Sequence, residues 1–154
     1  MASIDSIVLR DSIMLRDSVI LREFGEGDFD SLAGLWTLTG IGNPARGDDL
    51  ECIRRSLECR GSLLVIACKS DIIGSLWLTD DGRRLYIHHM AVHPDWRRQG
   101  LARRLMETAR AEAGARRLQM KLEVHRDNAG AIALYRAFGF ETLGEHEVMI
   151  RREI

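Results

Sequence analysis

The sequence lacks the segments that direct a chain into or across a membrane. No stretch approaches the ~18 consecutive apolar residues of a membrane span, and the first residues lack a basic head followed by a long apolar run, so we expect no signal peptide. Cysteine is scarce as well. Cys52, Cys59 and Cys68 are odd in number and lack metal-ligand spacing, which favours small buried apolar residues in a reducing cytosol.

The chain also lacks an excess of charge of one sign. It has 22 basic and 23 acidic residues and a net charge of −1, which argues against a protein that binds nucleic acid over its whole surface. The 154 residues, 45% of them hydrophobic, are enough for one domain with a real core. We therefore expect a cytoplasmic protein with no nucleic-acid or membrane partner and no metal.

A hexapeptide repeat, "SIVLRD SIMLRD SVILRE", occupies residues 6–23. Because six is an even number, each copy would present the same face in a strand, whereas in a helix the pattern would rotate by about 240° per copy. The repeat therefore predicts strand, with only the last copy needed in the core. The upstream copies would form an added edge strand, a partner contact such as a homodimer, or a loose arm.

The rest of the chain divides into short helical and extended segments. The expected elements, after a strand at 19–24, are a helix capped by Asp28, a helix from about Asp49, strands at 63–69, 72–79 and 85–92, a helix from Leu101, a strand at about 119–125 and a helix after Asn128. The glycine-rich loop 39–48 follows a helix rather than a strand, so it does not have the context of a nucleotide-binding loop.

The segment "HPDWRRQGLARRL", residues 93–105, joins a strand to a helix. The first turn of a helix carries backbone N–H groups without helical partners and a partial positive charge. Gly100 lets another group approach this backbone closely, the small Ala102 leaves room in the next turn, and neighbouring arginines add charge. This pattern is typical of an anion site and favours a pyrophosphate.

Two motifs in this order resemble the GNAT superfamily of acetyl-CoA-dependent N-acetyltransferases. The [Arg/Gln]-x-x-Gly-x-[Gly/Ala] loop is met by Arg97, Gly100 and Ala102. The downstream pattern "N..A...Y...GF" is met by Asn128, Ala131, Tyr135, Gly139 and Phe140. The resemblance extends from about Val19 to the C-terminus. It implies residues 1–17 as a repeat extension and 18–154 as an acetyltransferase domain of the mixed α/β class, with a splayed sheet flanked by about four helices.

The resemblance also implies where acetyl-CoA would bind. The co-substrate would lie between the strand ending at Val92 and the strand ending at His125, with its pantetheine arm along the first of these and its pyrophosphate on the following helix. The implied cofactor-binding residues are Met90, Ala91, Val92, Arg97, Arg98, Gln99, Gly100, Leu101, Ala102, Arg103, Asn128 and Tyr135.

The catalytic roles follow from the chemistry together with the resemblance. Tyr135 matches the family's tyrosine, which protonates the departing thiolate; a transfer from a pKa of ~10 to ~8.5 is uphill by only about 2 kcal/mol. Glu123 matches the glutamate proposed as base in the RimI-like ribosomal-protein acetyltransferases. His88 is the rival base, and water the third alternative. In a regular strand His88 and His89 would point to opposite faces, so at most one would face the cleft.

The resemblance implies a primary amine as the acceptor, of a small molecule or of a peptide. The late segment "ETLGEHEVMIRREI" lacks the tyrosines that help RimI-type enzymes bind peptide N-termini, which favours a small, amino-acid-like acceptor over protein N-terminal acetylation. The candidate pocket is formed by the first helix, the loop 39–48 and the turn before a final strand, with the candidate residues Trp36, Asn43, Arg46 and Glu145. A non-catalytic acetyl-CoA-binding regulator and an interaction protein using the repeat remain as alternatives.

Overall fold

The structure is a computed structural model that describes residues 18–144 and 147–151. The chain forms two compact units, residues 1–123 and 124–154, and each is considered by itself. The hexapeptide copies upstream of Ser18, together with Glu145 and His146, lie outside the described residues.

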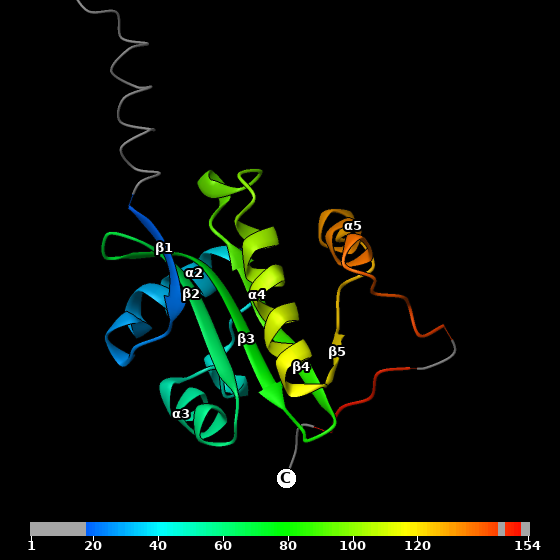
Figure 1. Cartoon of the computed structure of the whole chain (residues 1–154). Coiled ribbons are helices and arrows are strands. Elements are labelled where there is room, and N and C mark those ends of the chain that lie inside the picture. Colours follow the sequence, from blue (N-terminus) through cyan, green and yellow to red (C-terminus); the bar gives the residue numbers. More distant parts are fainter. Residues whose placement is uncertain (1–17, 145–146, 152–154) are drawn as a thin grey trace, which may run out of the picture. The chain divides into compact units, whose positions relative to one another are not determined.

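The first unit is built on a mixed five-stranded sheet. Its strands are β1 (Val19–Glu23), β2 (Ser62–Cys68), β3 (Asp71–Asp80), β4 (Arg84–Val92) and β5 (Gln119–Leu122), and they follow one another in this order across the sheet (Figure 1). Neighbours from β1 to β4 are antiparallel, whereas β4 and β5 are parallel. The predicted strands are thus present, and the mixed α/β class is confirmed.

Helices cover both faces of this sheet. They are α2 (Phe29–Thr39), α3 (Leu50–Glu58) and α4 (Leu101–Arg116), with short 3₁₀ turns η1 (Glu26–Asp28), η2 (Pro44–Arg46) and η3 (Pro94–Trp96). In Figure 1, α4 lies on one face and α2 and α3 lie on the other. Since β2 and β3 are covered on both sides, they are continuous apolar runs rather than alternating ones.

The core between α2, α3 and the sheet contains the larger aromatic residues. Its buried members are Leu32, Leu35, Trp36, Ile53, Leu63, Val65, Ala67, Ile72, Trp77 and Ala91. Leu63, Val65 and Ala67 alternate along β2, as the period of two along a strand requires. The opposite face of the sheet packs on Leu101, Leu105 and Ala109, which recur at the spacing of one helical stripe and are buried.

Three local expectations are corrected by the structure. Asp28 lies at the start of α2, but its carboxylate makes no cap hydrogen bond; it accepts from Arg22 at 2.6 and 2.8 Å and from the N–H of Gly25 instead. The fifth strand ends at Leu122 rather than at His125. Residues 141–144 and 147–151 contain no strand, so no final strand lies within the described part of that segment.

The cysteines agree only in part with the expectation. All three are free thiols; Cys68 is buried in β2 and Cys52 is half-buried, but Cys59 is exposed at the end of α3. In the part of the chain that the structure describes, no helix is both long and apolar enough to cross a bilayer.

The second unit contains α5 (Ala129–Ala137). Asn128 caps this helix, because its side-chain oxygen accepts the N–H of Ala131 at 3.1 Å. Gly139 follows the helix with φ +84°, the left-handed conformation that ends helices and favours glycine.

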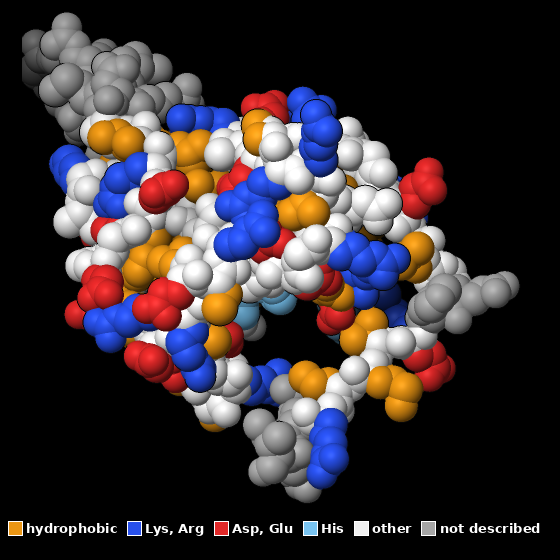
Figure 2. Space-filling model, turned by 60° about the horizontal axis from the view of Figure 1, so that its bottom comes forward, with side chains coloured by type: hydrophobic (Ala, Val, Ile, Leu, Met, Phe, Trp, Pro, Cys, Tyr) orange, Lys and Arg blue, Asp and Glu red, His pale blue; other side chains and the backbone are white. Residues whose placement is uncertain are grey.

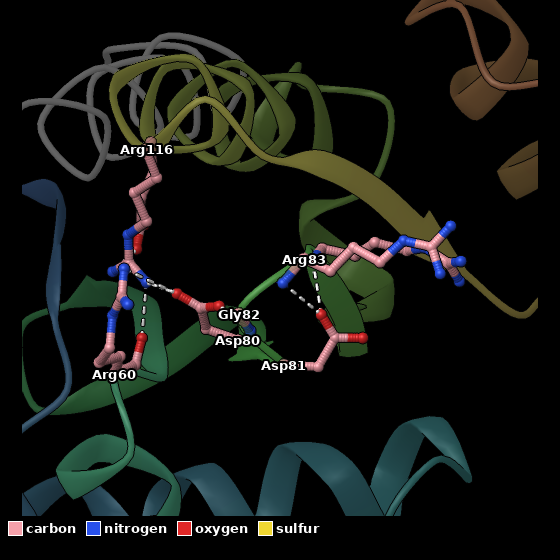
Figure 3. Close-up of polar contacts among 8 residues, drawn as sticks. Arg60, Asp80, Asp81, Gly82, Arg83 and Arg116 are labelled. Atoms are coloured by element: carbon pink, nitrogen blue, oxygen red, sulfur yellow. Dashed lines mark hydrogen bonds and ion pairs between the residues drawn. The ribbon is translucent and has the colours of Figure 1, made fainter.

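A buried aspartate ties three elements together at one end of the sheet (Figure 3). Asp80 closes β3, and its side chain is 1% exposed. It lies 3.2 Å from the Nη1 atom of Arg116 in the last turn of α4 and 3.4 Å from the Nη2 atom of Arg60. Its other oxygen accepts the N–H of Gly82 at 2.7 Å. The same Arg116 nitrogen donates to the Arg60 carbonyl at 2.6 Å.

Replacing Asp80 with Ala should lower the free energy of unfolding by about 2–3 kcal/mol, because two guanidinium groups lose their buried charged partner. The neighbouring Asp81 is the matched control: it accepts the N–H groups of Arg83 and Arg84 at the exposed turn, and Asp81→Ala should cost less. Urea unfolding of the two variants measures this. A smaller loss for Asp80→Ala than for Asp81→Ala would contradict the account.

Candidate active site

The loop between β4 and α4 is fixed by its own hydrogen bonds. The Nε atom of Arg97 donates to the carbonyl of Val92 at 3.2 Å, and the side-chain amide of Gln99 donates to the carbonyl of Asp95 at 3.3 Å. Pro94 begins η3 directly after the strand. The predicted strand–loop–helix arrangement is therefore present, and the proline lies where the chain leaves the sheet.

Gly100 is the N-cap residue of α4 and has φ +81°, a conformation that favours glycine. Arg98, two residues earlier, is also left-handed, with φ +62°. A Cβ atom added to Gly100 would meet no protein atom within 4 Å, so the space beside this backbone is open. Leu101 and Leu105 are buried and anchor the helix, while its first turn carries the N–H groups that suit an anion.

Charges of both signs surround this region. Arg97, Arg98, Arg103 and Arg104 are exposed. Asp95 in the same loop is exposed as well. Figure 2 brings the other end of α4 forward, and there too acidic side chains lie among the basic ones. An anion here would therefore be attracted by the helix terminus and its arginines rather than by the charge of the whole face.

Strand β4 contains a β-bulge at its centre. His88 pairs with Trp77 and Ala91 pairs with Ser75, so His89 and Met90 together lie opposite the single residue Leu76. His89 takes up the irregularity with φ +43°, an uncommon value for a residue other than glycine. A bulge of this kind disrupts the ladder locally and redirects side chains.

The bulge brings both histidines to the same side of the sheet, so the prediction that they point to opposite faces is wrong. The ring of His88 lies 6.1 Å from Trp77 and stacks on Tyr86 at 5.6 Å. The ring of His89 lies 5.6 Å from Trp77 and 4.7 Å from Trp36. In a regular strand, successive side chains point to opposite faces. The extra residue of the bulge interrupts this alternation.

Glu123 and His88 occupy neighbouring places where β4 and β5 separate. The pairing of the two strands ends at Ile87 and Leu122, and the next residues are His88 and Glu123. Burial lowers the pKa of His88, and so does a charge on His89, while the charges of Glu123 and Asp48 raise it. The Nε2 atom of His88 lies 2.8 Å from the hydroxyl of Thr79. With its net pKa below the usual ~6.5, His88 is neutral at pH 7 and able to accept a proton.

The loop 39–48 contacts the bulge through Asp48. An oxygen of this carboxylate accepts the N–H of Asn43 at 2.7 Å and lies 3.0 Å from Nε2 of His89. That imidazole atom is buried and makes no hydrogen bond, so its contact with Asp48 becomes an ion pair only when His89 is protonated. Sequence reasoning did not single out His89 or Asp48. Neither belongs to a recognisable motif, and their contact depends on the bulge.

The acceptor-pocket candidates differ in exposure. Trp36 is 2% exposed and stacks on Trp77 with ring centres 5.9 Å apart, so it belongs to the core. Asn43 is half-buried, whereas Arg46 is exposed. Among the described residues, no group of three or more histidine, cysteine, aspartate or glutamate side chains is placed to hold a metal ion.

Tyr135 lies in α5 of the second unit and is 9% exposed. Its ring packs on Phe140 at 5.8 Å. Burial raises the pKa of its hydroxyl above the usual ~10, so the phenol stays protonated at neutral pH. Asn128, which the resemblance places beside the cofactor, has its side-chain oxygen engaged as the cap of this helix.

Comparison with known proteins gives a family match. The model of the acetyltransferase (GNAT) family matches residues 35–140. An acetyltransferase of Pectobacterium atrosepticum is 27% identical over 121 residues, which cover 78% of this chain and 86% of the relative.

Two solved structures share the fold. The ribosomal-protein-S18-alanine N-acetyltransferase of Escherichia coli has a TM-score of 0.68 and 22% identity, and the match covers 80% of this chain and 77% of that one. An aminoglycoside acetyltransferase from an uncultured soil metagenomic sample, in complex with trehalose, has a TM-score of 0.68 and 16% identity over 88% and 98% of the two chains.

Replacing Gly100 with Val should weaken acetyl-CoA binding by about tenfold or more, ~1.4 kcal/mol. A left-handed φ strains a β-branched residue, and the new side chain would occupy the open space beside the helix terminus. Gly82 in the β3–β4 turn is the control, since it has φ +79° and equally open surroundings. Calorimetry on both variants measures the effect. Unchanged affinity in Gly100→Val, or an equal loss in Gly82→Val, would exclude a pyrophosphate at α4.

Proposed function

The chain belongs to the GNAT acetyltransferase family and is therefore an acyltransferase, and on that premise we propose that it moves the acetyl group of acetyl-CoA to the primary amine of a small, amino-acid-like acceptor. The amine attacks the thioester directly in a ternary complex. The observation that carries the proposal is the open, left-handed backbone at Gly100, in the loop that follows the bulged strand β4. A phosphate would bind at the first, and an acyl group would lie beside the second.

The bulge of β4 and the start of α4 would bind the two ends of acetyl-CoA. The backbone of Met90–Val92 would pair with the pantetheine arm as an added strand, in the gap left where β5 stops pairing with β4. The amides of residues 98–103 would bind the pyrophosphate, and Arg97 and the neighbouring arginines would balance its charge. A backbone N–H of β4 at the bulge would donate to the oxyanion that forms at the thioester carbon.

The pair His88 and Glu123 would remove the proton from the amine. An alkylamine has a pKa of ~10.4 and is protonated at neutral pH, so it cannot attack until it loses that proton. His88 is neutral because burial lowers its pKa, and Glu123 is exposed beside it. Either group can accept the proton directly or through water.

Tyr135 would protonate the departing thiolate of coenzyme A. Its raised pKa keeps the phenol protonated across the neutral range, as a general acid requires. Transfer to a thiol of pKa ~8.5 is uphill by at least about 2 kcal/mol, which remains acceptable for a general acid acting in the transition state.

A protein N-terminus is the second candidate acceptor. The fold shared with the E. coli ribosomal-protein enzyme and the segment "LEV...N..AIALY" favour it, whereas the late segment without tyrosine favours a small amine. The aminoglycoside enzyme with the same fold shows that fold alone does not choose between the two.

Thiol release from acetyl-CoA, measured with a panel of small amines, amino acids and N-terminal peptides, tests the proposal. We expect turnover with a small amine or amino acid and little with peptides. Turnover with peptides alone would select the second candidate. Tight acetyl-CoA binding without turnover on any acceptor would indicate a binding protein instead.

Replacing Tyr135 with Phe removes one hydroxyl and little volume. Acetyl-CoA affinity should change little, while kcat should fall by about 10²–10⁴-fold, the usual contribution of a positioned general acid. Steady-state kinetics and calorimetry on the same preparation separate the two effects. A Tyr135→Phe enzyme with unimpaired kcat would remove Tyr135 from the mechanism.

The pH dependence of kcat/KM distinguishes the two bases. If His88 accepts the proton, the rate falls as pH drops through its lowered pKa, below ~6.5. Glu123→Gln then removes a charge that raises this pKa, so the acid limb moves to still lower pH while the plateau rate is kept. If Glu123 is the base, Glu123→Gln loses most activity at low pH and recovers as rising pH deprotonates the amine.

His88→Ala completes this comparison. It should abolish the acid limb if His88 is the base and leave the limb in place if Glu123 is. Parallel profiles for wild type and both variants would assign proton removal to water.

A further inference from the structure

Ser75 in β3 is fully buried. A buried hydroxyl is costly unless its hydrogen bonds are made. Ser75 makes two: its Oγ atom lies 3.0 Å from Nε1 of Trp36 and 3.0 Å from the carbonyl oxygen of His89. It therefore connects helix α2 on one side with the bulge of β4 on the other.

The direction of both hydrogen bonds is fixed by chemistry. An indole N–H can only donate and a carbonyl can only accept. The Ser75 hydroxyl therefore accepts from Trp36 and gives its single proton to His89. His89, whose carbonyl accepts this hydrogen bond, has a left-handed backbone with φ +43°. It lies in the bulge, where the regular pairing of β3 and β4 is interrupted.

His89 is held on its other sides as well. Its ring lies against Trp36 and Trp77, and its Nε2 atom lies 3.0 Å from Asp48 in the loop 39–48. These contacts hold the ring of His89, whereas the hydrogen bond from Ser75 to the His89 carbonyl holds its backbone. Loss of this bond would remove the side-chain contact on the carbonyl of His89, which belongs to the bulge.

We infer that Ser75 is a positioning residue for acetyl transfer: its hydroxyl holds the carbonyl of His89 and thereby keeps the bulge of β4 in the conformation that presents backbone donors to the acyl group. This inference rests on the proposed function, because the bulge matters to catalysis only if the thioester lies beside it. Ser75 would not touch the substrates. It would act through the backbone of His89, and Trp36 would link that backbone to the helix preceding the acceptor loop.

Ser56 offers a matched control. Its hydroxyl accepts from Nε1 of Trp77 at 2.9 Å, much as Ser75 accepts from Trp36. Ser56 lies in α3, however, and within the described part of the chain its hydroxyl makes no hydrogen bond to β4. Ser75→Ala and Ser56→Ala each remove the acceptor of one buried indole. Only the first also removes the donor to the bulge.

With the acceptor found in the amine panel, Ser75→Ala should lower kcat by about 10- to 100-fold, the scale of a misplacement by about 1 Å, with KM for the acceptor within about threefold of wild type. Ser56→Ala should keep kcat within about twofold. Ser75→Cys, with a weaker donor of similar size, should give an intermediate kcat and keeps the test usable if Ser75→Ala folds poorly. Equal kcat in Ser75→Ala and Ser56→Ala would overturn the inference.

Hydrogen exchange of the amides of residues 88–92 gives a readout without any acceptor. Exchange should be faster than in wild type for Ser75→Ala and unchanged for Ser56→Ala, in the full chain with and without acetyl-CoA. Unchanged exchange in Ser75→Ala would overturn the inference even if activity fell. If the wild-type protein acetylates no amine, the proposed function is refuted. Faster exchange in Ser75→Ala would then still support the role of Ser75 in holding the bulge.

Discussion

The β-bulge of β4 is the constraint on which the candidate site depends. Two residues, His89 and Met90, lie opposite the single residue Leu76. Because of the extra residue, side chains on the two sides of the bulge point to different faces of the sheet than they would in a regular strand. Both histidines then lie on the side of Trp36 and Trp77. The bulge falls just beyond the point where β5 stops pairing with β4. The bulge, the two histidines and the end of the β4–β5 pairing therefore lie within a few residues of one another along β4.

Burial has opposite effects on the pKa values of His88 and Tyr135, two of the three groups proposed to transfer protons. It lowers the pKa of His88 and raises that of Tyr135, because in each case it disfavours the charged form. The consequence is a neutral base and a neutral acid at the same pH, which is the arrangement that amine deprotonation and thiolate protonation require. At the proposed phosphate site, the exposed arginines and the N-terminus of α4 would supply the positive charge that an anion needs.

Much of this fold follows from local sequence patterns, whereas the bulge does not. The runs in β2 and β3 are apolar and bounded by turn residues, and Gly100 stands at the start of a clear helical stripe, so these elements were predictable. The bulge depends on how β3 and β4 pair. Leu85, Ile87 and Ala91 stand an even number of residues apart, so they would share one face of a regular strand. Of the three, only Ala91 belongs to the core cluster that contains Trp36. In the same way, Ser75 resembles a polar residue of an ordinary strand, and Asp28 resembles a helix cap until Arg22 is found beside it.

A crystal structure of the protein with acetyl-CoA bound tests the central claim most directly. We expect the thioester carbonyl within hydrogen-bond distance of a β4 backbone N–H between His88 and Val92. We also expect the diphosphate on the amides of residues 98–103, with the bulge at His89 unchanged. A diphosphate at α4 with the thioester away from the bulge would contradict the proposed catalytic geometry, and acetyl-CoA bound elsewhere would contradict the whole assignment of the site.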